Sequence, residues 1–272
     1  MLRLPIFYLI VVSGMYFLQD YFIYYPQKTD PQLIEQAAAS RDLQLWPQNV
    51  KTYRGFISPR ASQKSLGTIL VFHGNAGNAL DRTYYAGALN RLGYRVILVE
   101  YPAYGSRPGK TSEKEFTADA IESIRLALKE FGRPIYLLGE SLGCGVVCGA
   151  VANSHMPIDG VALITPWDSL INLARDKYWF LPVKWMLRDR YDNVANLTDY
   201  RGPVAVAMAG RDEIISNRLT RHLYDALRQP KRLWTFPKAG HNSWPSGPHE
   251  SWWGEMTNFL QTTKTGKESS KP

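Results

Sequence analysis

Cysteine is scarce in this sequence, and that scarcity limits the chemistry that thiols can supply. The 272 residues include two cysteines, Cys144 and Cys148, which lie one helical turn apart. A disulfide across one turn of a helix would strain its geometry, and two thiols alone are too few ligands for a zinc site. We therefore expect both cysteines to pack as small apolar side chains.

Clustered positive charge is also missing, although the chain is basic overall. The formal net charge is +8, a surplus that can indicate a nucleic-acid or anionic membrane partner. The lysines and arginines are scattered, however, with no basic stripe and no RNA-binding motif of interleaved aromatic residues. We expect no nucleic-acid partner.

A complete dinucleotide-binding loop is absent as well. Gly143-Cys144-Gly145 follows a predicted strand, as such loops do, but the third glycine is missing. The acidic residue expected at a strand end about twenty positions later is not evident either. These absences argue against an oxidoreductase.

What the sequence does contain is an alternation of strands and helices, without an internal repeat. Its length and its 45% hydrophobic content suit one large domain rather than two. Short apolar runs alternate with helical patterns, which predicts an α/β domain with a doubly wound, mostly parallel sheet. The expected strands are 67–72, 94–99, 135–138, 160–164, 204–209 and 231–236, and the expected helices are 79–92, 113–131, 142–153, 217–227 and 251–261.

The same pattern divides the chain into four parts. We predict an N-terminal anchor at 1–25, a connector at 26–48 with a short helix near 33–39, the domain at 49–262 and a flexible polar tail at 263–272. The domain is expected to begin with an edge strand at 50–57. An aromatic stretch predicts a cap of short helices inserted at about 167–200.

The N-terminal segment reads as a membrane anchor. Residues 4–18 are almost wholly apolar and reach roughly 22 Å as a helix, so the aromatic residues at 21–25 are needed to complete a tilted span. A cleavable signal peptide is one alternative, but no small-residue cleavage site follows, and a buried helix of the domain is another. Arg3 and Asp20 favour a cytoplasmic N-terminus, with the domain on the opposite side of the membrane.

A candidate nucleophile lies in Gly139-Glu140-Ser141-Leu142-Gly143, between a predicted strand and a predicted helix. A sharp strand-to-helix turn exposes a serine hydroxyl, and glycines at its two ends avoid collisions with the neighbouring backbone. The same turn directs the Leu142 N–H group at the place where an oxyanion would form. We predict that Ser141 is nucleophilic.

Two further residues complete a catalytic set. A serine nucleophile needs a histidine base and a carboxylate that orients the histidine, and in this topology the carboxylate precedes the histidine along the chain. Asp212 follows the predicted strand 204–209, and His241 follows the predicted strand 231–236. We predict Ser141, Asp212 and His241 as the catalytic residues.

Other polar residues fit these roles less well. Glu213 adjoins Asp212 and could substitute for it, whereas Asp168 comes one strand too early and is expected to cap a helix of the insertion. His222 is expected to be solvated, and His249 to lie near the start of the last helix.

The loop after the predicted strand 67–72 should supply the second oxyanion donor. In its His73-Gly74-Asn75 turn, the Asn75 backbone N–H group is the expected donor, and His73 is expected to hold the loop by hydrogen bonds. The mechanism is then a two-step acyl transfer through an acyl-enzyme, which requires no metal and no cofactor.

Tryptophans are the candidate substrate-pocket residues. The insertion contributes Trp167, Trp179 and Trp185, and Trp244 follows His241 closely. One interpretation is an apolar acyl pocket beside a membrane, suited to lipid-like esters or acylated proteins. The alternative is that these side chains merely pack the cap onto the domain.

Four stretches carry a family resemblance: Phe72-His73-Gly74-Asn75-Ala76-Gly77-Asn78, Gly139-Glu140-Ser141-Leu142-Gly143, Gly210-Arg211-Asp212-Glu213 and Gly240-His241-Asn242. Together they resemble the α/β-hydrolases, and more narrowly their branch with one N-terminal membrane anchor, which includes fungal bud-emergence proteins and bacterial relatives. The resemblance spans about 21–260 and implies an ester, thioester or lipid hydrolase with the triad named above. That branch usually has D-Y-R-G-Y-G where this chain has Glu100-Tyr101-Pro102-Ala103-Tyr104-Gly105, which is expected to alter the local loop.

Two other functions stay open at the level of sequence. The same residues could cleave amides, which would make the protein a peptidase or amidase. A non-catalytic, membrane-tethered binding module would be indicated by loss of a triad residue, and none is lost.

Overall fold

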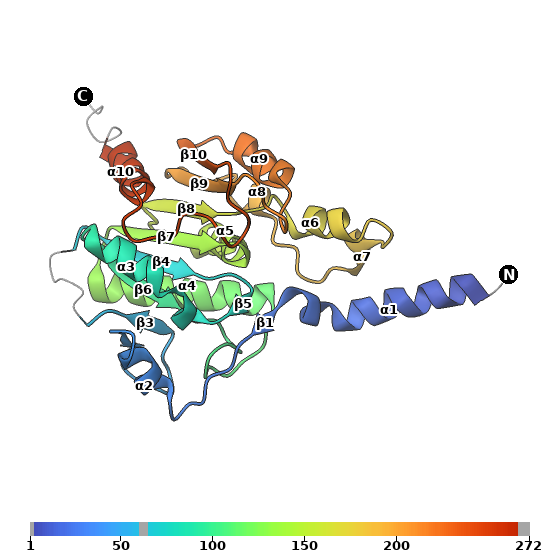
Figure 1. Ribbon diagram of the computed structural model, residues 1–272, viewed down its shortest axis with the longest axis horizontal. Coiled ribbons are helices and arrows are strands. Elements are labelled where there is room, and N and C mark those ends of the chain that lie inside the picture. The colour runs from blue at the N-terminus through green and yellow to red at the C-terminus, as the bar shows by residue number, and fades with distance from the viewer. Residues whose placement is uncertain (1–2, 60–64, 266–272) are drawn as a thin grey trace.

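The domain is built on one eight-stranded sheet with helices on both faces (Figure 1). The computed structural model describes residues 3–59 and 65–265. The strand order is β10-β9-β8-β7-β4-β6-β3-β2, and all neighbouring pairs from β10 to β6 are parallel. The strands are β2 (Gln44–Trp46), β3 (Gly55–Ile57), β4 (Thr68–Phe72), β6 (Arg95–Val99), β7 (Ile135–Glu140), β8 (Gly160–Ile164), β9 (Val204–Ala209) and β10 (Lys231–Phe236). The predicted doubly wound, mostly parallel sheet is confirmed.

Alternate residues of the central strands supply two separate hydrophobic cores. In β4, Leu70 and Phe72 face one core, whereas Ile69 and Val71 face the other. This two-residue period follows from the pleat of a strand, and it explains why both faces must be apolar. The first core packs α4 (Glu113–Phe131), α5 (Leu142–Ser154) and α9 (Asn217–Ala226), and the second packs α2 (Ile34–Ala39), α3 (Thr83–Arg91) and α10 (Trp252–Thr265).

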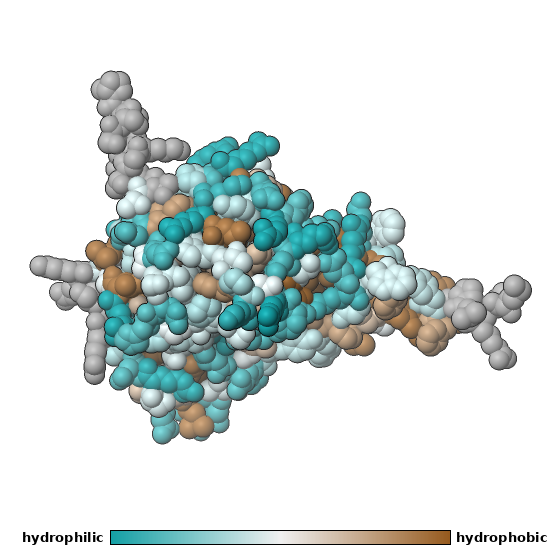
Figure 2. Space-filling model, turned by 45° about the horizontal axis from the view of Figure 1, so that its top comes forward, coloured by the Kyte–Doolittle hydropathy of each residue, from teal (hydrophilic) through white to brown (hydrophobic). Residues whose placement is uncertain are grey.

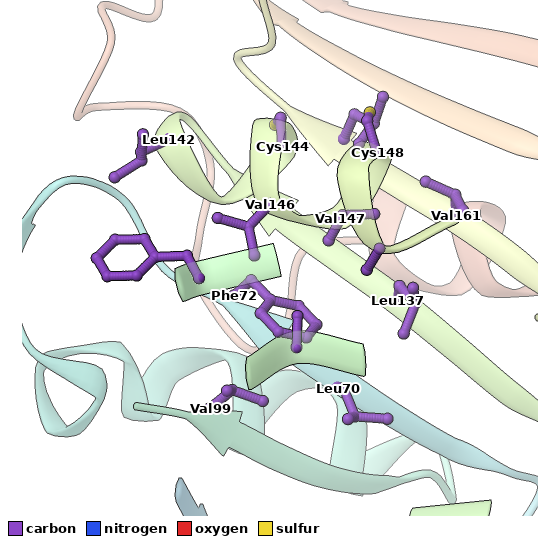
Figure 3. Close-up of a cluster of buried hydrophobic side chains, with 14 of the residues drawn as sticks. Leu70, Phe72, Val99, Leu137, Leu142, Cys144, Val146, Val147, Cys148 and Val161 are labelled. Atoms are coloured by element: carbon purple, nitrogen blue, oxygen red, sulfur yellow. The ribbon is translucent and has the colours of Figure 1, made fainter. Parts of the chain in front are cut away.

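Helix α5 lies at the centre of the first core (Figure 3). Cys144 and Cys148 are both fully buried there with free thiols, as predicted for small apolar side chains. Burial raises the pKa of both thiols above its ordinary value, which keeps them protonated. They therefore contribute packing rather than reactivity.

The N-terminal boundary of the domain differs from the prediction. β2 pairs antiparallel with β3, so the sheet begins at Gln44 and not at residue 49. β3 is therefore not an edge strand, because it lies between β6 and β2. The short helix predicted near 33–39 is present as α2, and its Ile34 and Ala38 side chains are buried in the second core. The predicted connector thus belongs in large part to the domain.

The insertion between β8 and β9 holds three short helices: α6 (Leu170–Lys177), α7 (Val183–Met186) and α8 (Asn193–Asn196). Leu197 and Tyr191, which flank α8, are buried in the first core. Helices α6 and α7 extend away from the sheet toward the N-terminal helix (Figure 1). We call the segment from Leu170 to Leu187 the cap.

The N-terminal helix, α1 (Arg3–Ile23), projects from the domain (Figure 1). Residues Ile6–Ile23 are long and apolar enough to cross a membrane, judged by length and composition. At the other end of the chain, α10 continues to Thr265 and so includes the first residues of the predicted tail. The rest of that tail, 266–272, lies outside the described residues.

Candidate active site

Ser141 occupies a strained turn between β7 and α5. Its backbone has φ 51° and ψ −114°, a conformation that costs a non-glycine residue on the order of 1–3 kcal/mol. Neighbouring glycines make the turn possible. A Cβ atom on Gly143 would lie 1.9 Å from the Phe72 carbonyl oxygen, and one on Gly139 would lie 2.6 Å from the Gly143 backbone. The collisions expected from the sequence are therefore real.

Ser141, His241 and Asp212 form one hydrogen-bonded chain. The His241 Nε2 atom lies 3.0 Å from the Ser141 Oγ atom, and the Nδ1 atom lies 2.8 Å from Asp212 Oδ2. When Nδ1–H donates to the carboxylate, Nε2 carries no proton and can accept the serine hydroxyl. Such a chain can turn a serine into a nucleophile.

The backbone holds Asp212 in place. Its Oδ1 atom accepts hydrogen bonds from the Ile214 and Ile215 N–H groups at 2.9 and 2.7 Å, which leaves Oδ2 for the histidine. Glu213 has a different partner, because its Oε2 atom accepts from the His241 backbone N–H at 3.0 Å. That hydrogen bond lowers the pKa of Glu213. Of the two neighbouring carboxylates, Asp212 contacts the imidazole ring and Glu213 the loop that carries it.

Asp168 departs from its expected role as a helix cap. The residue that caps α6 is Ser169, whose hydroxyl accepts from the Asn172 N–H group. Asp168 is buried and instead contacts Asn172 Nδ2 at 2.8 Å and His222 Nδ1 at 2.6 Å. His222 is 60% exposed at its side chain, so it is solvated as predicted, but it also has a carboxylate partner.

The turn that follows β4 lies against Ser141. A Cβ atom placed on Gly74 would be 3.6 Å from the Ser141 Cβ atom, so a side chain at this position would contact the serine. Leu142 begins α5, and the first N–H groups of a helix have no acceptor within it. Asn75 and Leu142 both line the same cavity as Ser141, where their N–H groups could serve a developing oxyanion.

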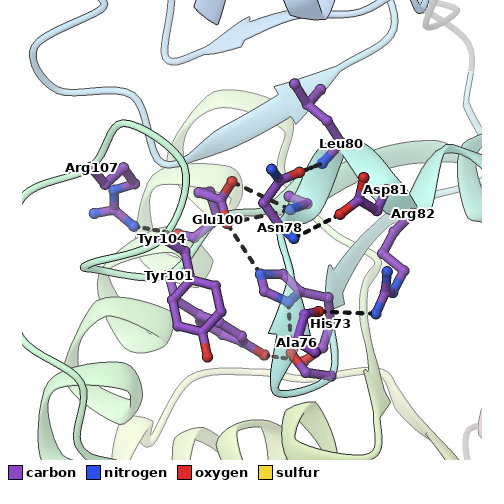
Figure 4. Close-up of polar contacts among 12 residues, drawn as sticks. His73, Ala76, Asn78, Leu80, Asp81, Arg82, Glu100, Tyr101, Tyr104 and Arg107 are labelled. Atoms are coloured by element: carbon purple, nitrogen blue, oxygen red, sulfur yellow. Dashed lines mark hydrogen bonds and ion pairs between the residues drawn. The ribbon is translucent and has the colours of Figure 1, made fainter. Parts of the chain in front are cut away.

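A buried polar cluster fixes that turn from the side of β6 (Figure 4). The His73 ring joins the Gly74 carbonyl at 2.8 Å and the Glu100 carboxylate at 3.1 Å. The Tyr101 and Tyr104 hydroxyls donate to the carbonyls of His73 and Asn75, at 2.7 and 2.6 Å. His73 therefore positions the loop.

The loop that departs from the family pattern has a strained backbone at Ala103. This residue has φ 66°, a left-handed conformation that glycine adopts freely and alanine does not. The Arg107 guanidinium, a few residues later, binds the Glu100 carbonyl and the Asp119 carboxylate, and so ties the loop to α4.

Sequence reasoning missed a carboxylate next to the nucleophile. Glu140 accepts hydrogen bonds from the Tyr84 and Tyr85 hydroxyls, both at 2.7 Å, and from Arg82 Nε at 3.2 Å. Burial is the largest single influence on Arg82 and lowers its pKa, but Glu140, Tyr84, Tyr85 and Asp81 together outweigh burial and raise the pKa above its ordinary value. The G-x-S-x-G pattern leaves that position free, so no local signal indicated this cluster.

A cavity of about 540 Å³ opens at Ser141. Of the four candidate tryptophans, Trp167 lines it and the other three do not. Trp179 and Trp185 are 82% and 81% exposed, because they lie at the tip of the cap. Trp244 is buried among the rings of Tyr84, Tyr85, Trp252 and Trp253. Among the described residues, no group of three or more His, Cys, Asp or Glu side chains could hold a metal ion.

Comparisons with known proteins agree with this architecture. A family model described as the alpha/beta hydrolase fold matches residues 67–198. An uncharacterised protein of Mycobacterium tuberculosis is 32% identical over 236 residues, which are 85% of this chain and 83% of that protein. The lysophosphatidylserine lipase ABHD12 of Danio rerio is 29% identical over 193 residues, 64% of this chain and 50% of its own length. The chain thus matches about half of that lipase.

Solved structures give the same fold. An esterase of Pyrococcus furiosus has a TM-score of 0.61 at 18% identity, covering 76% of this chain and 84% of its own. A monoacylglycerol lipase of Paleococcus ferrophilus has a TM-score of 0.54 at 19% identity, covering 72% and 95%. With the family model and the mycobacterial relative, these likenesses establish that the chain belongs to the α/β-hydrolase superfamily.

Proposed function

We propose that the protein is a serine hydrolase that cleaves carboxylic esters or thioesters of lipid-like or acylated substrates. The observation that carries the proposal is the Asp212–His241–Ser141 chain, which ends at an apolar cavity. Ester cleavage needs an activated nucleophile and an adjacent apolar space for the acyl group, and this site offers both.

The proposed mechanism has two acyl-transfer steps. His241 Nε2 takes the proton of the Ser141 hydroxyl as Oγ bonds to the substrate carbonyl carbon, and the Asn75 and Leu142 N–H groups hold the oxyanion. The bond to the leaving group then breaks, and His241 returns the proton to the departing oxygen or sulfur. Water repeats the attack on the acyl-enzyme, which releases the acid and restores Ser141.

Helix α1 is the segment that would link the protein to a membrane. We take Ile6–Ile23 as a single-pass anchor whose C-terminal half also packs against the cap, so that the cap lies at the membrane surface and the rest of the catalytic domain lies outside the bilayer on the extracytoplasmic side. Lysophosphatidylserine lipase ABHD12 and the monoacylglycerol lipase act, by their names, on single-chain lipids, which supports a lipid-like ester as substrate. An anchored enzyme would meet such a substrate at the membrane surface.

The test is hydrolysis of p-nitrophenyl esters, from acetyl to palmitoyl, by the full chain in detergent, together with labelling by a fluorophosphonate probe. Ser141→Ala should abolish labelling and lower kcat by at least about 10³-fold, because the nucleophile is lost. Turnover and labelling that survive Ser141→Ala would refute the proposal. A folded wild type that neither labels nor hydrolyses any ester would favour a tethered-binding role.

A further inference from the structure

Helix α1 contributes side chains to the cavity that contains Ser141. Met15, Gln19, Phe22 and Ile23 all line it, opposite apolar residues of the cap. A helix that served only as a tether would need no such contact. The cap lines it mainly with apolar residues, among them Leu173, Tyr178, Leu181, Val183, Met186 and Leu187, and also with Lys177.

Hydrogen bonds hold α1 in one register on the cap. Gln19 is only 6% exposed, and its side chain donates to the Met186 carbonyl at 3.2 Å and accepts from the Arg188 N–H at 2.9 Å. The same amide nitrogen also donates to the Tyr16 carbonyl of its own helix at 2.7 Å, so a shift of the helix along the cap would cost the bonds to Met186 and Arg188 and leave the amide oxygen without its partner. Just after the helix, the Tyr24 hydroxyl donates to Asp189 at 2.6 Å.

The end of α1 is also joined to the turn beside Ser141. The Asn75 side chain donates to the Ile23 carbonyl at 3.1 Å. The next residues form β1 (Tyr25–Pro26), which pairs in parallel with β5 (Ala76–Gly77) directly after Asn75. Ile23 therefore lies at the end of α1 that is nearest to Ser141.

Met15 lies at the other end of the part of α1 that lines the cavity. From Ile23 to Met15 the helix rises about 12 Å, and beyond Met15 its Val11 and Val12 side chains pack directly on the cap cluster of Leu181, Val183 and Met186. Met15 packs on the same cluster, so the contact between α1 and the cap bounds the cavity at this end. Figure 2 shows hydrophobic side chains continuing along the part of α1 that projects from the domain.

We propose that α1 is one wall of the acyl-binding site. On the proposed function, on which this inference rests, the hydrocarbon chain of the ester runs from Ser141 along α1 between Ile23 and Met15. Its far end meets Met15 and the cap, so a residue of the anchor helix limits the length of the acyl group. The anchor is then part of the substrate site.

The test compares two tryptophan substitutions in the full chain, assayed in detergent with the ester series. Met15→Trp fills the far end of the cavity and should lower kcat/KM for decanoyl relative to acetyl ester by roughly 10-fold to 100-fold. Leu18→Trp is the matched control: Leu18 lies on the same helix, is 49% exposed and is not a lining residue. Its ester profile should match the wild type.

An unchanged decanoyl-to-acetyl ratio in Met15→Trp, with fluorophosphonate labelling retained, would overturn the inference while leaving the serine mechanism intact. If Met15→Trp loses acetyl turnover too, Met15→Ala decides the matter. Shortening that side chain should move the preferred acyl length upward, and an unshifted optimum would count against α1 as the wall. Failure of the proposed function itself would appear as a wild type with neither labelling nor turnover.

Discussion

The cavity at Ser141 has two walls of different construction. One is made by loops at the strand ends, where backbone hydrogen bonds and glycines position Ser141, Asn75, Asp212 and His241. The other is made by α1 and the cap, which meet through apolar side chains and the bonds of Gln19. On the proposed mechanism, the first wall carries charge and proton transfer, which tolerate little displacement, and the second only has to offer apolar surface of the right length. The first wall therefore needs precise positioning of its residues, whereas the residues of the second can vary.

The largest effect is expected from the carboxylate of the first wall. Asp212→Asn should lower kcat by roughly 10³–10⁴-fold, because an amide no longer holds the histidine in its reactive tautomer. Glu213→Gln is the matched control and should cost only a few-fold, since Glu213 contacts the backbone N–H of His241. Equal losses in the two variants would show that both carboxylates serve the imidazole.

The next largest effect is on stability and concerns the turn between β7 and α5 that holds Ser141. Gly143→Ala places a methyl group 1.9 Å from the Phe72 carbonyl oxygen and should lower the free energy of unfolding by about 3 kcal/mol or more. Gly254→Ala, in α10, meets nothing within 4 Å and should raise it by about 0.5–1 kcal/mol. Denaturant unfolding measures both, and a tolerated Gly143→Ala would contradict the close packing described for this turn.

Asn75 links the two walls, and a smaller effect is expected there. Asn75→Ala keeps the backbone N–H but removes the bond to the Ile23 carbonyl, so the oxyanion donor is held less firmly. We expect kcat to fall about tenfold, less than for complete loss of a donor, with KM unchanged. The fall should be equal for acetyl and decanoyl esters. A loss confined to the decanoyl ester would assign the Asn75 side chain to the acyl site instead.

The smallest effect is expected at Ala103, on the loop that supports His73. Ala103→Gly relieves the left-handed backbone at φ 66° and should raise the free energy of unfolding by about 1 kcal/mol. Catalysis should not change, because the loop keeps its hydrogen bonds. A loss of stability would mean that the alanine side chain contributes packing that outweighs the strain.

The first wall could be predicted from the sequence, and the second could not. Each residue of the first lies directly after an apolar run, in a short pattern such as Gly139 to Gly143, so local spacing indicates its place. The contacts of the second join residues about 170 positions apart, such as Gln19 and Met186, and leave no local pattern. A polar residue within an apolar helix was the available signal.

The same contrast explains two errors in the fold and pocket predictions. β2 has three residues followed by Pro47, too few to show a strand period, and it is defined by its pairing with β3. Trp179 and Trp185 were assigned to the pocket by residue type alone, whereas the path of the cap places them at its exposed tip. Tertiary contacts decided both cases.

The most direct test of the account uses an alkyl fluorophosphonate with a photoreactive diazirine at the end of its chain. The probe should phosphonylate Ser141, and irradiation should then join the chain end to peptides containing Met15 or the cap residues from Leu181 to Met186. This result would confirm the nucleophile and locate the acyl chain in one experiment. Modification of another residue, or cross-links from phosphonylated Ser141 that reach neither α1 nor the cap, would contradict it.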